Sequence, residues 1–290
     1  NNDSNLEFVF SRDPNLALVK NNISIHYTFV IDAQYVPDVG FASKFFRTLH
    51  VEVDSQLVSS TKSQFEYPLY TYLQYIGNFD LKYVMSTHAA EGFGDIISDN
   101  SDTINELLKT GRLKYTVNKH DKTAKTRTFE VIFTPCQGFL NDPDPLLPNS
   151  ELRLSFERAP SSLSFLLKKE VSPAKVIDDV IKLQDCYAMV EYVSSPNLRN
   201  YFSTIEEKPI SYIYDDCEIL MKNIPTGQTN IRIDSIRGGN CPLYFFAGII
   251  PTDNIMGNFE KSSTYFGPNQ VQDIAIKVNG NVIENYPLTM

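Results

Sequence analysis

A strand–turn–strand pattern occurs twice in this chain, once in its first quarter and again close to its last residue. The first copy runs from His50 to Val58, and Tyr67-Pro68-Leu69 follows it. The second copy runs from Ala275 to Ile283, and Tyr286-Pro287-Leu288 follows it. Apolar positions that alternate on both sides of a short polar turn are typical of a β-hairpin. A hairpin repeated at domain-scale spacing indicates two similar all-β domains in tandem, and chance recurrence of a common pattern is the alternative.

The two hairpins carry turn signals of different strength. Asn279-Gly280 predicts a type I′ turn, because both central residues of that turn take a positive φ. Asp54-Ser55 is a weaker version of the same signal.

The first 160 residues contain further strand and helix signals. Period-two alternation of apolar residues predicts strands at 23–31, 128–133 and 152–156. A short helix is predicted at 67–76, with Pro68 in its first turn and Gly77 just past its end, and a second at 102–109. The turn-rich residues 141–145 connect two of the strands.

A second series of strands follows a segment that holds Pro160, Lys168-Lys169 and Pro173. These strands are predicted at 186–193, 210–214, 228–236, 244–250 and 273–283. Many short strands joined by turns, with no long amphipathic helix, are typical of sandwiches or barrels. We therefore divide the chain into a first domain at 1–160, a linker at 161–175 and a second domain at 176–290.

Composition narrows the classes of function. The 290 residues carry a net charge of −9, whereas nucleic-acid binders show a basic footprint, so we predict no sequence-specific nucleic-acid binding. A basic cluster at 114–127 fits a solvated loop between two strands better than a phosphate site. The longest apolar run, 243–250, is too short to span a bilayer, and the polar N-terminus shows no signal peptide. Four well-separated cysteines indicate free thiols in a reducing compartment; they are Cys136, Cys186, Cys217 and Cys241.

No pattern in the sequence indicates catalysis or metal binding. The histidines show no metal-ligand spacing and no nucleophile partner; they are His26, His50, His88 and His120. Gly92-Phe93-Gly94 and Gly238-Gly239 lack the context of a phosphate loop. The acidic groups Asp142 with Asp144, and Asp178-Asp179 with Asp185, do not follow the calcium-loop pattern. We therefore predict no catalytic, cofactor-binding or metal-binding residue and no enzymatic activity, although a carboxylate pair brought together by the fold stays open.

Several pieces of the chain, read in order, resemble the double jelly-roll major capsid proteins of Polinton (Maverick) elements and the related adintoviruses. Residues 22–30 match the place of the first long strand of that family, and 39–49 match the segment that leads into its next strand. Leu57-Val58-Ser59-Ser60 and the Tyr-Pro helix at 67–73 follow in the same order.

The resemblance continues in the second half of the chain. Residues 248–259 are similar to a stretch of the family that contains an aspartate-asparagine pair and a phenylalanine, and 274–288 are similar to the strand–turn–proline segment that comes next. The chain departs from the family at 261–266, where Lys-Ser-Ser-Thr-Tyr-Phe replaces its usual Lys-Asn-Pro-Phe run. The match is scattered but collinear over most of the chain.

The resemblance implies an all-β fold of two tandem jelly-roll sandwiches, a double jelly roll, with short helices in the loops. It implies a structural protein of the virion that forms homotrimers with a pseudo-hexagonal outline, which tile an icosahedral shell around double-stranded DNA. The implied partners are further copies of the chain and a penton or minor capsid protein, with no cofactor and no membrane span. Two rivals stay open, because fold does not settle function: a jelly-roll binding module such as a lectin or receptor-binding domain, and a carbohydrate-active enzyme.

The position of the second hairpin leads to one more expectation. The first domain continues to about Arg158 after its hairpin, whereas only Thr289 and Met290 follow the second copy beyond its proline exit. If the domains are equivalent, the second lacks its last strands and exposes unpaired edges. We then expect the chain to be cut short or completed by strands from elsewhere, such as a second polypeptide.

Overall fold

In the computed structural model, the chain is described over most of its first 200 residues and over shorter pieces of the remainder. The described residues are 5–61, 65–77, 117–121, 123, 125–142, 144–167, 181–197, 200, 204, 211–214, 218–228, 230–232, 246–264, 266, 273–275, 277–278, 281–282 and 288–289. All structural statements below concern these residues.

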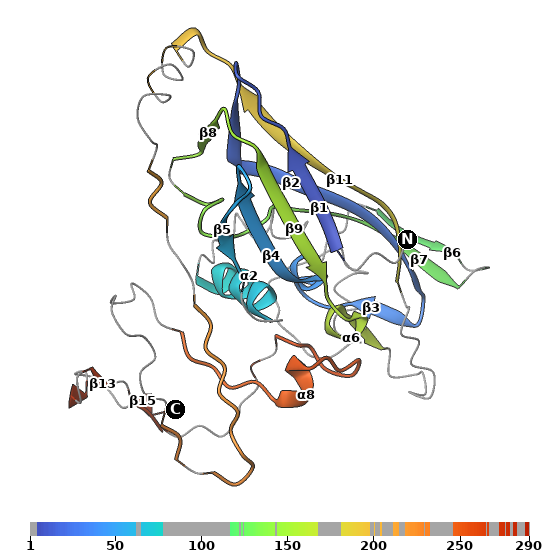
Figure 1. Cartoon of the computed structure of the whole chain (residues 1–290). Helices are drawn as coiled ribbons and strands as arrows, with labels where there is room; N and C mark the ends of the chain where they lie inside the picture. Colours follow the sequence, from blue (N-terminus) through green and yellow to red (C-terminus); the bar gives the residue numbers. More distant parts are fainter. Residues whose placement is uncertain are drawn as a thin grey trace.

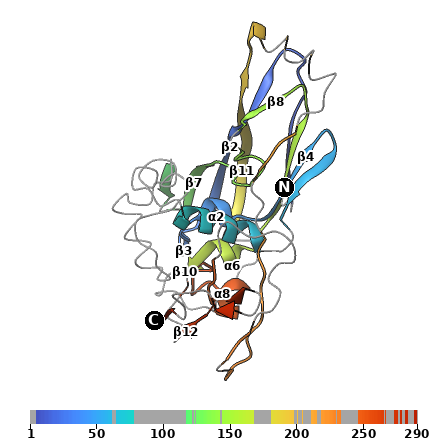
Figure 2. The ribbon, with the colours of Figure 1, turned by 90° about the vertical axis from the view of Figure 1, so that its left-hand side faces the viewer.

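Two antiparallel sheets build the N-terminal part of the molecule. The first sheet has the strand order β1-β9-β4-β5; its strands are β1 (Asn5–Phe10), β4 (Phe46–Val53), β5 (Gln56–Ser60) and β9 (Leu152–Arg158). The second has the order β11-β2-β7-β6, with β8 also paired to β2; its strands are β2 (Ala17–Asp32), β6 (Val117–Asp121), β7 (Thr126–Phe133), β8 (Leu146–Pro148) and β11 (Ile181–Val193). Figures 1 and 2 show β4 in one layer and β2 with β11 in the other.

The two sheets pack face to face over an aromatic core. On β2, alternate residues from Ile23 to Ile31 are buried, because period-two alternation places every second side chain on the inner face. Rings cross the gap between the sheets: Phe133 of β7 lies 5.4 Å from Phe46 of β4 and 6.0 Å from Phe156 of β9, between ring centroids. The core is therefore that of a sandwich.

The connections between the sheets follow the jelly-roll pattern. Successive long strands alternate between layers, since β1 lies in the first sheet, β2 in the second and β4 in the first again. Strands distant in sequence then become neighbours: β9 inserts between β1 and β4, and β7 lies beside β2. Such long return connections are those of nested Greek keys. The N-terminal sandwich is a jelly roll.

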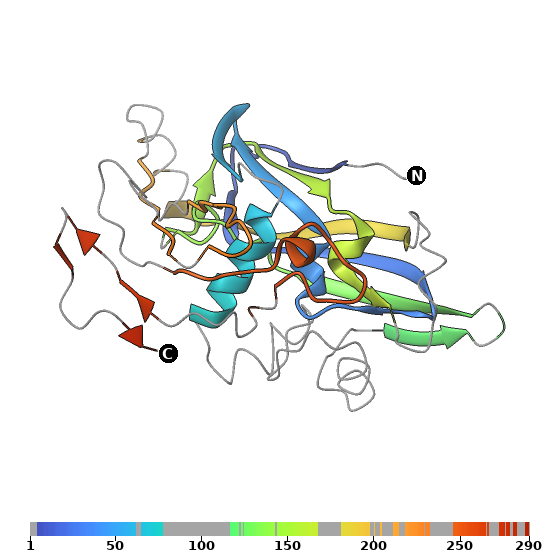
Figure 3. The ribbon, with the colours of Figure 1, turned by 90° about the horizontal axis from the view of Figure 1, so that it is seen from below.

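Short helices and a small two-stranded sheet close one end of this sandwich. The helices are α1 (Phe41–Lys44), α2 (Glu66–Gly77) and α6 (Ser161–Ser164), and the small sheet pairs β3 (Tyr35–Pro37) with β10 (Phe165–Leu167). Figure 3 views the molecule from this end, where α2 and α6 lie on either side of α8 (Thr252–Ile255). No helix in the described part of the chain is long and apolar enough to span a bilayer.

The predictions for the first domain are largely confirmed. The predicted strands lie within β2, β7 and β9, and the predicted helix at 67–76 is α2, which includes Gly77 as its last residue. Asp54 and Ser55 have φ of 48° and 64°, the positive pair that a type I′ turn requires. The helix predicted at 102–109 lies outside the described residues.

The structure departs from the predicted linker at its beginning. Residues 161–167 form α6 and β10, and Leu163, Phe165 and Leu166 are buried. The prolines and paired lysines pointed to a linker, but the apolar side chains between them pack against the sandwich.

Strand β11 also departs from its predicted place. The sequence predicts a strand at 186–193 in the second series, yet Ile181 to Val193 pair with β2 of the first sandwich over the whole length of β11. Period-two alternation predicts that a strand exists but not which sheet it joins. The division of the remaining chain into domains stays a prediction.

The C-terminal predictions are confirmed for hairpin pairing and wrong for several strands. β13 (Lys277–Val278) pairs with β14 (Asn281–Val282), as the second hairpin requires, and its Asn-Gly turn lies outside the described residues. β12 (Asp273–Ile274) pairs with β15 (Leu288–Thr289). Residues 211–214, 230–232 and 246–250, which are described parts of three predicted strands, form no strand, and Tyr212 and Tyr214 pack against the sandwich core. The described C-terminal residues contain no second sandwich.

Candidate functional site

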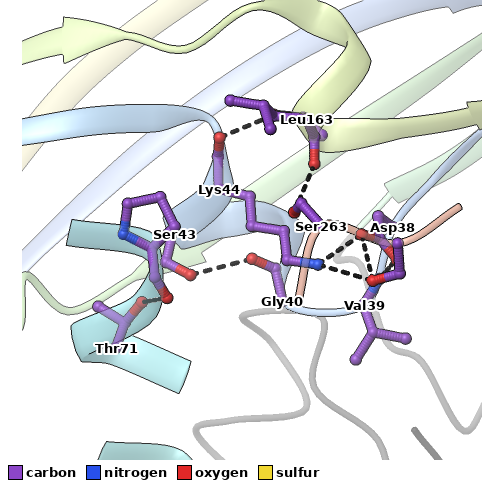
Figure 4. Close-up of polar contacts among 11 residues, drawn as sticks. Asp38, Val39, Gly40, Ser43, Lys44, Thr71, Leu163 and Ser263 are labelled. Carbon is purple, nitrogen blue, oxygen red and sulfur yellow. Dashed lines mark hydrogen bonds and ion pairs between the residues drawn. The ribbon is translucent and has the colours of Figure 1, made fainter. Parts of the chain in front are cut away.

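A buried ion pair lies where β3 leads into α1. Gly40 turns the chain with a φ of 70°, and this turn brings Lys44 back over Asp38. The side chains of both residues are 1% exposed, and the Lys44 ammonium donates to Asp38 Oδ2 (Figure 4). Burial lowers the pKa of Lys44, and the attraction and hydrogen bond of Asp38 only partly offset this effect.

Ser262, from the C-terminal half of the chain, joins the buried pair. Its hydroxyl donates to Asp38 Oδ2 at 2.8 Å and accepts from Lys44 Nζ at 3.1 Å. The backbone N–H of Val39 donates to Asp38 Oδ1 at 2.8 Å. Both carboxylate oxygens therefore have hydrogen-bond donors.

The segment around Ser262 is fixed to the same end of the sandwich by further contacts. Ser263 Oγ donates to the Leu163 carbonyl at 3.2 Å (Figure 4), and the Leu167 N–H donates to the Phe259 carbonyl at 2.7 Å. The Phe259 ring lies 5.4 Å from the Tyr35 ring. Residues 258–264, which we call the strap, are thus hydrogen-bonded to α6 and β10.

A small apolar cluster continues the strap toward α2. Its buried residues are Phe65, Leu69, Ala159 and Leu163, and Ile219, Ile250, Ile255 and Phe266 pack against it. The Phe266 ring also stacks on Tyr72 at 5.8 Å. Burial, with the nearby Tyr75 and Asp38, raises the pKa of Tyr72 to about 12. The C-terminal half therefore covers apolar surface of the sandwich as well as its buried charges.

A second buried ion pair joins β2 to the residues that precede β8. Lys20 Nζ donates to Asp142 Oδ2 at 2.9 Å, and both side chains are almost fully buried. The ammonium also lies 4.6 Å from the ring of Phe139 and 4.4 Å from that of Tyr212. Burial alone would raise the pKa of Asp142, but the Asp144 N–H and Lys20 bring it below its usual range.

The outer face of β11 exposes large apolar side chains. Tyr187 is 50% exposed and Met189 is 55% exposed, with Tyr192 further along the same strand. Tyr187 stacks on His26 of β2, with 4.8 Å between ring centroids. In the described residues β11 ends its sheet, with β2 as its strand partner. An apolar row on the last strand of a sheet is a surface suited to association.

The residues considered as candidates for catalysis or metal binding are mostly spread over different elements of the described structure. His26 lies on the outer face of β2 and His50 in β4, and no group of three metal-ligating side chains occurs among the described residues. Asp142 is held by Lys20, and Asp185 lies in β11. Cys136 and Cys186 are not in disulfides, and burial raises the pKa of the Cys186 thiol to about 11. His88, Asp178-Asp179, Cys217, Cys241 and both glycine-rich spots lie outside the described residues.

The described residues of the basic cluster lie on a hairpin and not only in the predicted loop, because Lys119 and His120 belong to β6 and Arg127 belongs to β7. β6 pairs with β7, and Lys125 takes a φ of 53° in the turn between them. Arg127 pairs with His120 of β6, and burial lowers the pKa of the Arg127 guanidinium.

Sequence reasoning missed both buried lysines. Alternation does not mark either position: Lys20 has the parity opposite to the buried row from Ile23 to Ile31, and Lys44 lies in the short helix α1. A lysine that the fold buries must have a partner. What the sequence could not supply was the identity of the partners Ser262 and Tyr212.

Comparisons with known proteins give little information about this chain. No family model matches it, and no curated protein matches it. Among solved structures, it is similar to the quasi-atomic model of the PBCV-1 virus capsid, at 13% identity and a TM-score of 0.36. It is also similar to the crystal structure of PBCV-1 VP54 fitted into a reconstruction of the virophage Sputnik, at 13% identity and a TM-score of 0.35. Each alignment covers 69% of this chain and 40% of the other, and scores this low carry no argument by themselves.

Proposed function

We propose that this chain is a major capsid protein of the Polinton and adintovirus type, a structural subunit of a virion shell. The observation that carries the proposal is the jelly-roll connectivity of the N-terminal sandwich, in which β9 lies between β1 and β4 and β7 lies beside β2. The resembling segments of the first half of the chain fall on elements of this sandwich: 22–30 on β2, 39–49 on α1 and β4, 57–60 on β5, and 67–73 on α2.

In this role the chain acts by assembly, without a cofactor or a catalytic residue. Three copies associate into a capsomer with a pseudo-hexagonal outline, and capsomers then meet one another and a penton or minor capsid protein in an icosahedral shell. The second jelly roll expected from the sequence belongs to the same proposal.

The outer face of β11 supplies a candidate contact for assembly. Interfaces concentrate aromatic residues and methionine at their centres, and Tyr187 and Met189 lie exposed in one row. We assign this row to packing against another jelly roll, within the capsomer or in its neighbour.

The test is the mass of the full-length protein in solution, by light scattering after size exclusion, followed by negative-stain microscopy. The proposal expects trimers with a pseudo-hexagonal outline. The double variant Tyr187→Ser with Met189→Ser should weaken association at least tenfold. Leu57→Ser is the matched control, because Leu57 is 59% exposed on β5 in the other sheet. A strict monomer at every concentration would contradict the proposal.

The binding-module alternative has one observation in its favour. The exposed Tyr187 ring, stacked on His26, offers a flat aromatic surface of the kind that packs against ligands. Saturable binding of one glycan by a monomeric protein, lost in Tyr187→Ser, would replace the capsid proposal with this one.

A further inference from the structure

Two lysine–aspartate pairs are buried in this sandwich, and they differ in what surrounds the ammonium. Lys20 lies over the rings of Phe139 and Tyr212, whose faces stabilise a positive charge. Lys44 instead contacts Asp38 together with a hydroxyl that hydrogen-bonds both members of the pair. Both pairs hold an amine against a carboxyl, but among the described residues the second pair adds a hydroxyl that bridges the two groups and can relay a proton between them.

We propose that Lys44 and Asp38 form an intramolecular isopeptide bond, with Ser262 as the proton relay. The amine nitrogen, the carboxyl group and the relay hydroxyl lie in one hydrogen-bonded ring, and both reacting side chains are 1% exposed. Such a site holds the reactants in contact and keeps out bulk water, so that attack is intramolecular.

The environment favours an uncharged Lys44 amine. An ammonium and a carboxylate lose their hydration when buried, and the cost is reduced if the proton passes from nitrogen to oxygen. The lowered pKa of Lys44, caused mainly by burial, acts in the same direction. A neutral amine is a nucleophile, and a protonated carboxyl can lose its hydroxyl as water.

The step is balanced without any added reagent. Lys44 first gives one proton to Asp38 Oδ2, and its nitrogen then attacks Asp38 Cγ. As the C–N bond forms, a second nitrogen proton passes to Ser262 Oγ while the Ser262 proton passes to Oδ2. The C–Oδ2 bond breaks and Oδ2 leaves as water. An ammonium and a carboxylate thus become one amide and one water molecule.

The hydrogen bonds on Asp38 suit this sequence of events. The Val39 N–H donates to Oδ1, the oxygen on which negative charge develops during attack, and is placed as an oxyanion-hole donor. Ser262 donates to Oδ2, the oxygen that leaves. The two carboxyl oxygens therefore have different donors that match different roles.

The position of Ser262 also sets the order of events. Ser262 belongs to the strap, which lies more than 200 residues beyond Asp38, since the two are 224 positions apart. The relay is in place only after the strap has docked on α6 and β10. The bond would then seal the β3–α1 corner once both halves of the chain have folded together.

The experiment is the intact mass of the denatured full-length protein, with tryptic mapping. The proposal expects a mass lower than that of the sequence by one water molecule. Trypsin should not cleave after Lys44, so residues 21–47 should appear as one peptide that is lighter by one water. Cleavage after Lys20 should be normal, which makes the second buried pair an internal control.

Variants of Lys44 and Ser262 distinguish the isopeptide bond from other reactions that release water. The Lys44→Arg variant should show the full mass of its own sequence. A succinimide at Asp38 would still form in this variant, which would then stay lighter by one water until mild base opened the ring. Ser262→Ala should slow bond formation at least tenfold, and Ser262→Thr should rescue it. A wild-type protein that keeps its full mass and is cleaved at Lys44 after prolonged incubation would overturn the proposal, even if no variant folds. The result is independent of assembly, because a monomer can carry the bond and a trimer can lack it.

Discussion

The ammonium of Lys20 lies 4.4 Å from the centre of the Tyr212 ring, which comes from the C-terminal half of the chain. The Tyr212 hydroxyl also donates to the Leu146 carbonyl at 3.0 Å, next to the point where β8 pairs with β2. Ser262 makes the corresponding contact at the other buried lysine, Lys44. The two lysines that are buried in the described residues, Lys20 and Lys44, are therefore both contacted by residues that the N-terminal part does not contain.

Replacing Tyr212 tests this coupling. Tyr212→Ala should lower the free energy of unfolding by about 2–3 kcal/mol, because it removes ring packing and leaves the buried ammonium without one of its partners. Tyr212→Phe keeps the ring and loses the hydrogen bond to Leu146, so its cost should be about 1 kcal/mol. Urea denaturation measures both, and Leu57→Ala serves as the control, because Leu57 is exposed and lies outside the proposed association surface. Equal costs for the two Tyr212 variants would show that the ring does not stabilise Lys20.

The aromatic core predicts a large effect at Phe29. Its ring is fully buried and lies 4.7 Å from Phe41 and 5.2 Å from Phe129. Phe29→Ala should cost about 3–5 kcal/mol, because the close-packed rings around the deleted side chain cannot all collapse into the cavity. Chemical denaturation checks the value, and a loss below about 1 kcal/mol would place Phe29 outside the core.

The β4–β5 turn predicts a stabilising substitution at Ser55. A φ of 64° is unfavourable for a residue with a Cβ and costs nothing for glycine. Ser55→Gly should raise the free energy of unfolding by about 0.5–1 kcal/mol, whereas Ser55→Val should lower it. Ser59→Gly, inside β5, is the control and should destabilise by about 0.5–1 kcal/mol. Thermal unfolding measures the stability of the three variants. Opposite effects of glycine at positions 55 and 59 would show that glycine is favoured at the turn position and unfavourable in the strand.

Tyr72 predicts a loss of stability at alkaline pH. Its pKa is raised from 10.0 to about 12 by burial and by Tyr75 and Asp38, so the folded state holds the phenol proton more tightly than the unfolded chain does. The stability linked to Tyr72 is then fully present below pH 10 and is lost as the pH rises toward about 12. Unfolding free energies measured across this range should fall less steeply in Tyr72→Phe than in the wild type. If the free energies of unfolding of the two proteins fell equally steeply with pH, Tyr72 would not be the group responsible for the loss.

The sequence by itself determined three strands of the sandwich, the β4–β5 turn and the inner face of β2. Alternation from Ile23 to Ile31 fixes which β2 side chains are buried, because a strand projects successive residues to opposite faces whatever sheet it joins. Asp54-Ser55 likewise specifies its turn through local backbone geometry. These signals are local, and they needed no knowledge of the partner strands.

Only the tertiary structure decided which distant segments meet. β11 has the alternation of an ordinary strand, and its pairing with β2 depends on contacts across more than a hundred residues of sequence. The covering of Lys20 by Tyr212 and of Lys44 by Ser262 depends in the same way on how the chain returns to the sandwich. Hydrogen bonds and ring contacts of this kind are set by positions in space, so the pattern around either residue alone does not encode them.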